Sequence, residues 1–117
     1  MTANLRINYI ELPANDLEVI KSFYSDTFGW AFQDFGEKYT AFNDGNIDGG
    51  FFLSELSSKT SKGSALVVLY SDDLESTHNI IVKNGGNIIK EIFAFPGGRR
   101  FHFEDPAGNE LAVWSDK

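Results

Sequence analysis

Apolar residues recur every three or four positions in two stretches of this chain, the spacing that lines one side of an α-helix. In the first stretch the recurring positions are Leu17, Ile20, Phe23, Tyr24 and Phe28. Asn15 or Asp16 is suited to cap the start of this helix, and Gly29 to end it in a left-handed conformation. The pattern therefore predicts an amphipathic helix that covers one face of a sheet.

The second helical stretch repeats this plan. Its apolar side is formed by Leu74, Thr77, Ile80 and Ile81. Asp72 or Asp73 is the expected cap, and Gly85-Gly86 is the expected end. Asp16 and Asp73 stand 57 positions apart, and the same offset aligns Tyr9 with Leu66. A period of this length with only two copies indicates a duplicated supersecondary unit.

Each helix follows one strand and precedes three short segments of strand-like alternation and composition. The expected segments are 31–35, 39–43 and 50–54, then 88–95, 99–104 and 109–114. We therefore predict an α+β domain spanning residues 1–117, made of two βαβββ modules at about 5–54 and 64–115. The polar segment 54–63 is interpreted as the linker. With helices on one side, the other faces of the two curved sheets are expected to define a groove.

Composition narrows the classes of function. The net charge is −7 and the longest basic cluster is Arg99-Arg100, which argues against nucleic-acid binding and against an anionic membrane surface. No apolar run approaches the ~20 residues of a membrane span. The start of the chain lacks the features of a signal peptide, and the cysteine count is zero. A cytoplasmic protein is the expectation.

The ending FPGGRRFHFEDPAGNELAVW and the first-helix sequence FYSDTFGW carry a family resemblance. With the duplicated plan, they resemble the vicinal oxygen chelate superfamily, which includes glyoxalase I, bleomycin-resistance proteins and extradiol dioxygenases. The chain is most similar to a single-domain, glyoxalase-related bacterial group. The resemblance implies the glyoxalase/bleomycin-resistance fold of paired βαβββ modules, a cavity between the sheets, and a homodimer whose arrangement depends on the linker.

Members of this superfamily that use a metal take four ligands from the first and last strand of each module. By resemblance, three of these positions are Tyr9, Leu66 and Ala112, and the fourth lies near residues 50–52. None of these residues is His, Glu, Asp or Cys, whereas a divalent ion needs three or four such donors. We therefore expect no metal site and no cofactor.

Strand alternation extends the list of groove-facing positions from Tyr9, Leu66 and Ala112. It gives a groove that is mainly apolar, with a few polar groups, as in small-molecule sites. The expected ligand-binding residues are Tyr9, Glu11, Trp30, Phe52, Leu66, Val68, Arg100, His102, Ala112 and Trp114.

Glu11, Tyr9 and His102 are the candidates for acid–base catalysis. For Glu11 the alternatives are a solvated strand end or an ion pair with Arg99 or Arg100. For His102, which alternates with Arg100 and Glu104, the alternative is an ordinary polar strand face. His78 is expected to be solvated on the second helix.

Two functions follow from these residues. The first is metal-free binding or sequestration of a small apolar or aromatic ligand, for which the net charge of −7 favours a cationic guest. The alternative is a glyoxalase-like lyase, isomerase or related enzyme that acts on a carbonyl compound or thioester with acid–base residues of the same groove. A third, plainer possibility is a domain that acts only through its dimer or a protein partner.

Overall fold

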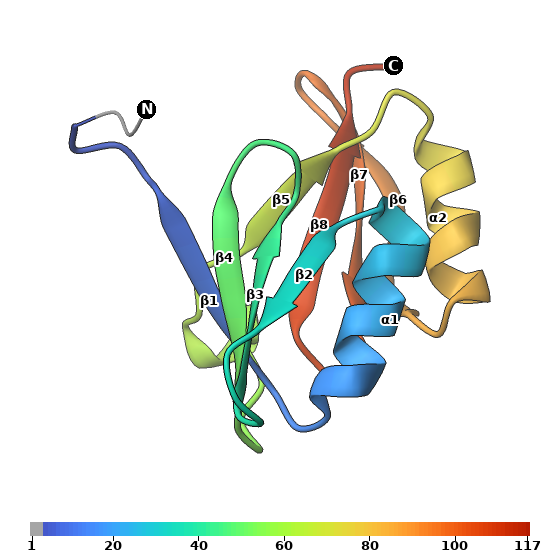
Figure 1. Cartoon of the computed structure of the whole chain (residues 1–117). Helices are drawn as coiled ribbons and strands as arrows, with labels where there is room; N and C mark the ends of the chain where they lie inside the picture. The colour runs from blue at the N-terminus through green and yellow to red at the C-terminus, as the bar shows by residue number, and fades with distance from the viewer. Residues whose placement is uncertain (1–3) are drawn as a thin grey trace.

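The chain folds into two βαβββ modules in a computed structural model that describes residues 4–117 (Figure 1). The first module contains β1 (Tyr9–Ala14), α1 (Leu17–Phe28), β2 (Ala31–Asp34), β3 (Tyr39–Asn43) and β4 (Asp48–Leu53). The second contains β5 (Val67–Tyr70), α2 (Leu74–Lys83), β6 (Asn87–Phe95), β7 (Gly98–Glu104) and β8 (Glu110–Ser115). The predicted fold class is confirmed, and the strands begin and end within about two residues of their expected positions.

Each module forms one four-stranded sheet. The first sheet has the order β1-β4-β3-β2, and the second has the corresponding order β5-β8-β7-β6. In both, the strand before the helix pairs in parallel with the last strand of the module, and the remaining pairs are antiparallel. The two sheets therefore place matching strands at matching positions, as the internal repeat predicts.

Both helices begin and end through the expected capping chemistry. The Asp16 carboxylate accepts a hydrogen bond from the Val19 amide at 3.1 Å, and the Asp73 carboxylate does the same for Ser76 at 3.1 Å. Gly29 ends α1 with a φ of 74°, a conformation that glycine adopts without steric cost. No helix within residues 4–117 is long and apolar enough to cross a membrane.

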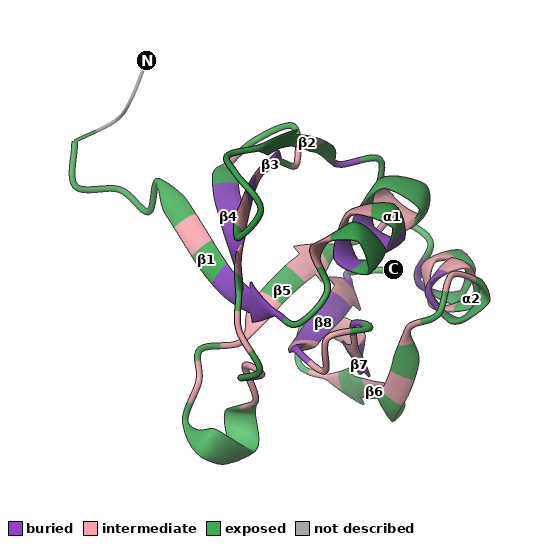
Figure 2. Cartoon of the chain, turned by 60° about the horizontal axis from the view of Figure 1, so that its bottom comes forward, coloured by how far each residue is buried: buried purple, intermediate pink, exposed green. Residues whose placement is uncertain are grey.

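α1 packs against both sheets and α2 against the second sheet, and both helices share one core with the sheets. The Tyr24 ring packs 5.3 Å from that of Phe51 in β4, and the Phe23 ring packs 6.2 Å from that of Phe103 in β7. Phe51 and Phe103 are fully buried in the same cluster. Figure 2 shows α1 on the inner side of both sheets. The other side of each sheet, which we call its open face, therefore points away from this core.

The strand pattern leaves open whether the groove lies within one chain or between two copies. Because the inner faces of both sheets meet a common core, their open faces lie on opposite outer sides of it instead of facing each other. Alternation correctly divides residues between inner and open faces. It carries no information about how one sheet is placed against the other.

The segment between the modules is more than a linker. It includes the 3-10 helix η1 (Thr60–Lys62) and is tied to the β7–β8 turn. The Ser57 hydroxyl donates to the Ala107 carbonyl at 2.7 Å, and the Ser58 amide donates to the side chain of Asn109 at 2.8 Å. The Lys59 ammonium contacts the Glu104 carboxylate at 2.6 Å. This segment therefore forms part of the second module's surface.

Candidate functional site

The open face of the second sheet gathers most of the expected site residues. Along β7, Phe101 and Phe103 are fully buried in the core, so Arg100 and His102 point to the open face. His102 is paired with Ala112 and then Val68 across the neighbouring strands. Arg100 is paired in the same way with Trp114 and then Tyr70. These two rows of residues form one continuous surface.

A hydrogen-bonded chain holds His102 in place. Its Nδ1 lies 2.9 Å from one oxygen of Glu110, which stands on the same face two residues before Ala112. The other Glu110 oxygen accepts from the Thr60 amide at 3.0 Å and from the Thr60 hydroxyl at 2.8 Å. His102 is only 7% exposed. The buried Nε2 of its ring has no hydrogen-bond partner among residues 4–117.

The environment of Glu110 determines how this chain is protonated. Burial favours the protonated acid, but the hydrogen bonds from His102 and Thr60 outweigh it and lower the pKa of Glu110 to about 2. An ionised carboxylate only accepts hydrogen bonds, so Nδ1 of His102 must donate to it. Nε2 is consequently the free nitrogen, an acceptor on the neutral ring and a donor on the protonated one.

Arg100 is enclosed by aromatic rings rather than by acids. Its guanidinium carbon lies 5.3 Å from the ring centroid of Phe93 and 5.7 Å from that of Phe95. Its buried Nε has no hydrogen-bond partner within the described chain. The neighbouring Arg99 differs, because its guanidinium binds both carboxylate oxygens of Glu75 and the carbonyl of Lys117.

The open face of the first sheet carries a different polar group. The Tyr39 hydroxyl donates to the Glu11 carboxylate at 2.8 Å and lies 2.6 Å from the Tyr9 hydroxyl. Gly50 makes this possible, since a Cβ there would lie 1.9 Å from the Tyr39 oxygen. Partial burial, followed by the contacts with Tyr9 and Glu11, raises the pKa of Tyr39. We call Tyr9, Glu11 and Tyr39 the phenol–carboxylate cluster.

The strand register also identifies the fourth metal-ligand position of the family. Gly50 pairs with Glu11 as Ala112 pairs with Val68, and Glu11 and Val68 are related by the internal repeat. The four positions thus hold the phenol of Tyr9, the side chain of Leu66, the methyl of Ala112 and the hydrogen of Gly50. Residues 4–117 contain no group of three or more His, Cys, Asp or Glu that could hold a metal ion. This set of residues does not fit the family's metal.

The expected site residues divide into three sets. Val68, Arg100, His102, Ala112 and Trp114 share the open face of the second sheet, with half-buried Leu66 just before β5. Tyr9, Glu11 and Phe52 share the open face of the first sheet. Trp30 belongs to neither face.

Three expectations are corrected. Trp30 is 8% exposed and stacks in the core at 4.5 Å from Tyr24, because it directly follows the end of α1. Glu11 contacts Tyr39 and not Arg99 or Arg100, so of the alternatives for this residue the ion pair is wrong. His78 is not fully solvated, since it lies 2.9 Å from Glu91 and packs edge-on against a buried phenylalanine of β7.

Sequence reasoning missed Tyr39, Thr60, Phe93 and Phe95 as site residues. The alternation of β3 gives Tyr39 a face but no partner, because its contact with Glu11 crosses an intervening strand. Thr60 stands in a polar segment with no periodic pattern. Irregular pairing between Lys90 and Phe93 also breaks the simple alternation of β6.

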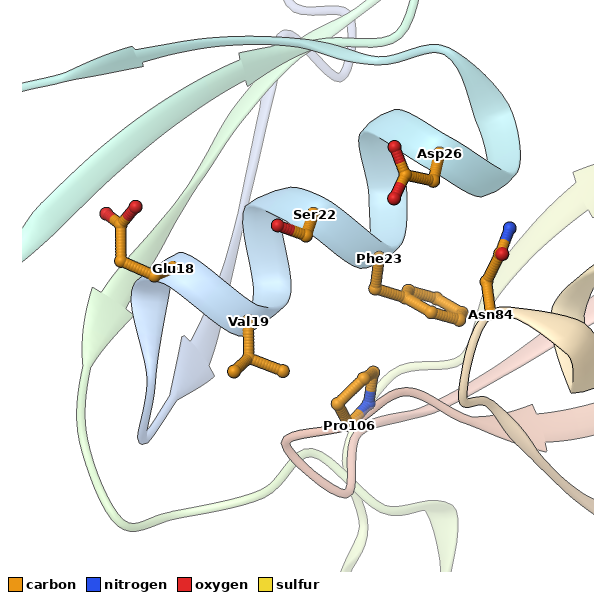
Figure 3. A pocket seen from close by; sticks show the side chains of 7 residues that line it. All are labelled: Glu18, Val19, Ser22, Phe23, Asp26, Asn84 and Pro106. Carbon is orange, nitrogen blue, oxygen red and sulfur yellow. The ribbon is translucent and has the colours of Figure 1, made fainter.

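Two surface hollows lie apart from these residues. The larger, about 320 Å³, lies beside α1 (Figure 3) and is lined by Glu18, Val19, Ser22, Phe23, Asp26, Asn84 and Pro106. The smaller, about 220 Å³, is lined by residues of β2, β3 and β4. Neither contains any of the expected ligand-binding residues. The second sheet is the stronger candidate because its buried nitrogens lack partners.

Comparisons with known proteins agree with this architecture. The profile of the Glyoxalase/Bleomycin resistance protein/Dioxygenase superfamily matches residues 6–113. A glyoxylase-like domain-containing protein of Didymella fabae is 32% identical over 126 residues, covering 97% of this chain and 95% of that protein.

Solved structures show the same fold at lower identity. A glyoxalase/bleomycin resistance protein/dioxygenase family enzyme of Burkholderia phytofirmans PsJN superposes with a TM-score of 0.79 at 16% identity, covering 94% of this chain and 98% of that one. A lactoylglutathione lyase of Agrobacterium tumefaciens superposes with a TM-score of 0.73 at 21% identity, covering 97% and 95%.

Proposed function

This chain belongs to the Glyoxalase/Bleomycin resistance protein/Dioxygenase superfamily, and from that premise we propose that it binds a small aromatic or apolar molecule without a metal. The binding surface is the open face of the second sheet. The observation that carries the proposal is the pairing of Ala112 with His102. Where the family places a metal ligand, this chain has a buried methyl beside an imidazole whose Nε2 has no partner among the described residues.

Aromatic side chains supply the apolar part of this surface. The Trp114 ring lies 5.2 Å from the ring of Tyr70 in a T-shaped arrangement and 6.4 Å from that of Phe95. Tyr70 and Val68 are exposed large hydrophobic residues on the adjacent strand. Burial of apolar and aromatic area is the main source of affinity for small ligands, and a few polar groups then fix their orientation.

A second copy of the chain would enclose the ligand, and we include a homodimer in the proposal. The open faces of one chain point apart, so a closed site needs the first sheet of one copy against the second sheet of another. Charge supports this pairing. Glu11 and Asp48 lie on the open face of the first sheet, and Lys90 and Arg100 on that of the second. Sedimentation equilibrium tests it: a monomer at micromolar concentration contradicts this part.

The binding proposal is tested with a library of small aromatic molecules screened by ligand-observed NMR in the presence of EDTA, a readout that does not depend on Trp114. We expect hits whose signal is lost in Trp114→Leu and kept in Phe35→Leu, which removes an exposed aromatic residue in the β2–β3 connection. Ligands that bind only when EDTA is left out would contradict metal-free binding. Hits that survive Trp114→Leu would place the ligand elsewhere.

An enzyme is the alternative, and the His102–Glu110 contact favours it. A carboxylate that holds Nδ1 of an imidazole leaves Nε2 able to accept a proton, the arrangement of a general base. In this reading the substrate is a carbonyl compound or thioester. Turnover would then fall by about 10²-fold or more in His102→Gln, within the range that general-base catalysis contributes. Loss of turnover in Glu11→Gln instead would move the chemistry to the first sheet.

A further inference from the structure

Arg100 is a half-buried cation without an acidic partner. No carboxylate of the described chain lies within ion-pair distance of Arg100. The same holds for Lys90, whose ammonium lies 4.8 Å from the ring centroid of Phe93. The protein as a whole has a net charge of −7, so acidic side chains are abundant. Leaving a guanidinium nitrogen buried and unpaired is costly unless something else binds it.

His102 and Arg100 present their unused nitrogens to the same side of β7. They stand two residues apart on one strand, so their backbones are separated by about 6.7 Å. A carboxylate can place one oxygen toward each of two donors on such neighbouring side chains, or bind the edge of a guanidinium with both oxygens. The Nδ1–Glu110 contact turns Nε2 away from the acidic side of the ring.

The rings around Arg100 restrict the shape of what it binds. Phe93 and Phe95 cover the guanidinium, so the donors that remain lie along its edge. Trp114 pairs with Arg100 across the sheet, and its ring lies 6.4 Å from that of Phe95, one of the two rings over the guanidinium. A planar group that is charged at one end and aromatic at the other would use both features.

We propose that this site binds an aromatic carboxylate, with the carboxylate held by the edge of the Arg100 guanidinium and by Nε2 of the protonated His102 ring, and with the aromatic ring packed against Trp114. The inference rests on the proposed function, whose site it shares, and it names the chemical class of the ligand. It also replaces the expectation of a cationic guest, which followed from net charge alone. Net charge averages over the whole surface, whereas affinity depends on the groups in contact.

The test compares three probes of similar size and different charge: benzoate, benzamide and benzylamine. Binding is followed by amide and indole chemical shifts of Trp114 in the intact protein. We expect benzoate to bind at least about tenfold more tightly than benzamide, because charged hydrogen bonds are the stronger ones. Benzylamine should bind most weakly. This comparison needs no substitution and so does not depend on the folding of any variant.

Two matched variants locate the effect. Arg100→Gln should weaken benzoate by about tenfold to a hundredfold and leave benzamide nearly unchanged. Arg99→Gln is the control, since Arg99 is already engaged by Glu75, and benzoate affinity should remain within about twofold of that of the wild type.

Three outcomes overturn the inference. If benzamide or benzylamine binds at Trp114 as tightly as benzoate, the binding function stands but the carboxylate class is wrong. If none of the three probes changes the Trp114 signals, both the carboxylate class and the proposed binding function are wrong. If benzoate does not bind and Arg100→Gln converts a dimer to monomers, the cationic side chains dock a carboxylate of a second copy instead.

Discussion

The two sides of the second sheet differ in whether their buried polar atoms have hydrogen-bond partners. On the inner side, both oxygens of Asp105 accept hydrogen bonds, one from the Tyr24 hydroxyl at 2.8 Å and the other from the Asn109 amide at 3.0 Å. The Asn109 side chain donates to the Pro13 carbonyl at 2.7 Å and accepts from the Ser58 amide at 2.8 Å. These five residues, which we call the Asp105–Asn109 network, join both modules and the segment between them.

On the open side, Nε2 of His102 and Nε of Arg100 are buried without a partner in the part of the chain that the structure describes. The side chains of the inner network use their hydrogen-bonding capacity within the fold. The open side holds His102 firmly through Glu110 and leaves the opposite nitrogen unused. The contrast indicates that the DPAGN sequence serves the fold, whereas the alternate positions of β7 belong to the surface that we propose for binding.

The largest effect should come from breaking the inner network. Asn109→Ala removes buried hydrogen bonds to two separate segments of chain, and we expect a loss of about 3–5 kcal/mol in the free energy of unfolding. Urea denaturation provides the measurement. His102→Gln on the open side is the comparison and should cost no more than about 1 kcal/mol. Equal losses in the two variants would remove the distinction between the two sides.

An acid titration should show the contribution of Glu110. Its pKa in the folded protein is lowered to about 2 from an ordinary 4.5, so its contribution to stability is complete above the ordinary value. That contribution is lost as the pH falls toward 2, and it amounts to about 2–3 kcal/mol. Urea denaturation between pH values near 5 and 2 should show this loss in the wild type. Glu110→Gln should have lower stability at pH 5 and a shallower acid dependence.

Asp105 should act in the opposite direction. Burial raises its pKa despite the hydrogen bonds from Tyr24 and Asn109, so its protonation favours the folded state as the pH falls. Asp105→Asn should therefore steepen the acid loss, while Glu110→Gln makes it shallower. Identical pH dependence in the two variants would show that the two carboxylates do not differ in the way the hydrogen bonds indicate.

The smallest effect is expected on the first sheet. Its phenol–carboxylate cluster is more exposed than either network of the second sheet, so water can replace what a substitution removes. Tyr39→Phe should cost no more than about 1 kcal/mol, and Tyr9→Phe is its matched control. Because the pKa of Tyr39 is raised, alkaline spectroscopic titration of Tyr39→Phe should lack one late-ionising phenol. A loss comparable to that of Asn109→Ala would contradict this ordering.

Much of the fold is determined by local patterns and was predictable. The helix caps at Asp16 and Asp73, the glycine end of α1 and the alternation of β7 each depend on residues close in sequence. The motif DPAGN was expected only as a turn. Its buried partners, Tyr24 and Pro13, are 81 and 96 residues away in the sequence, and no local pattern records them.

The errors also share a physical cause. Trp30 directly follows α1, and the turn of the chain at Gly29 directs its side chain into the core. The residue type alone does not reveal this direction. The repeat gives the faces of each sheet but not their mutual placement, so it could not decide whether the groove lies within one chain or between two copies. Thr60 is a site residue because its amide and hydroxyl donate hydrogen bonds to Glu110 of β8, a contact between segments far apart in sequence.

The central claim is that the site of the family's metal has become a surface for an organic ligand. The most direct test follows the backbone amide signals of Val68, His102 and Ala112 as stoichiometric zinc is added. The residues at the four family positions predict no saturable change in these signals. A saturable shift centred on Ala112 at equimolar zinc would contradict the account.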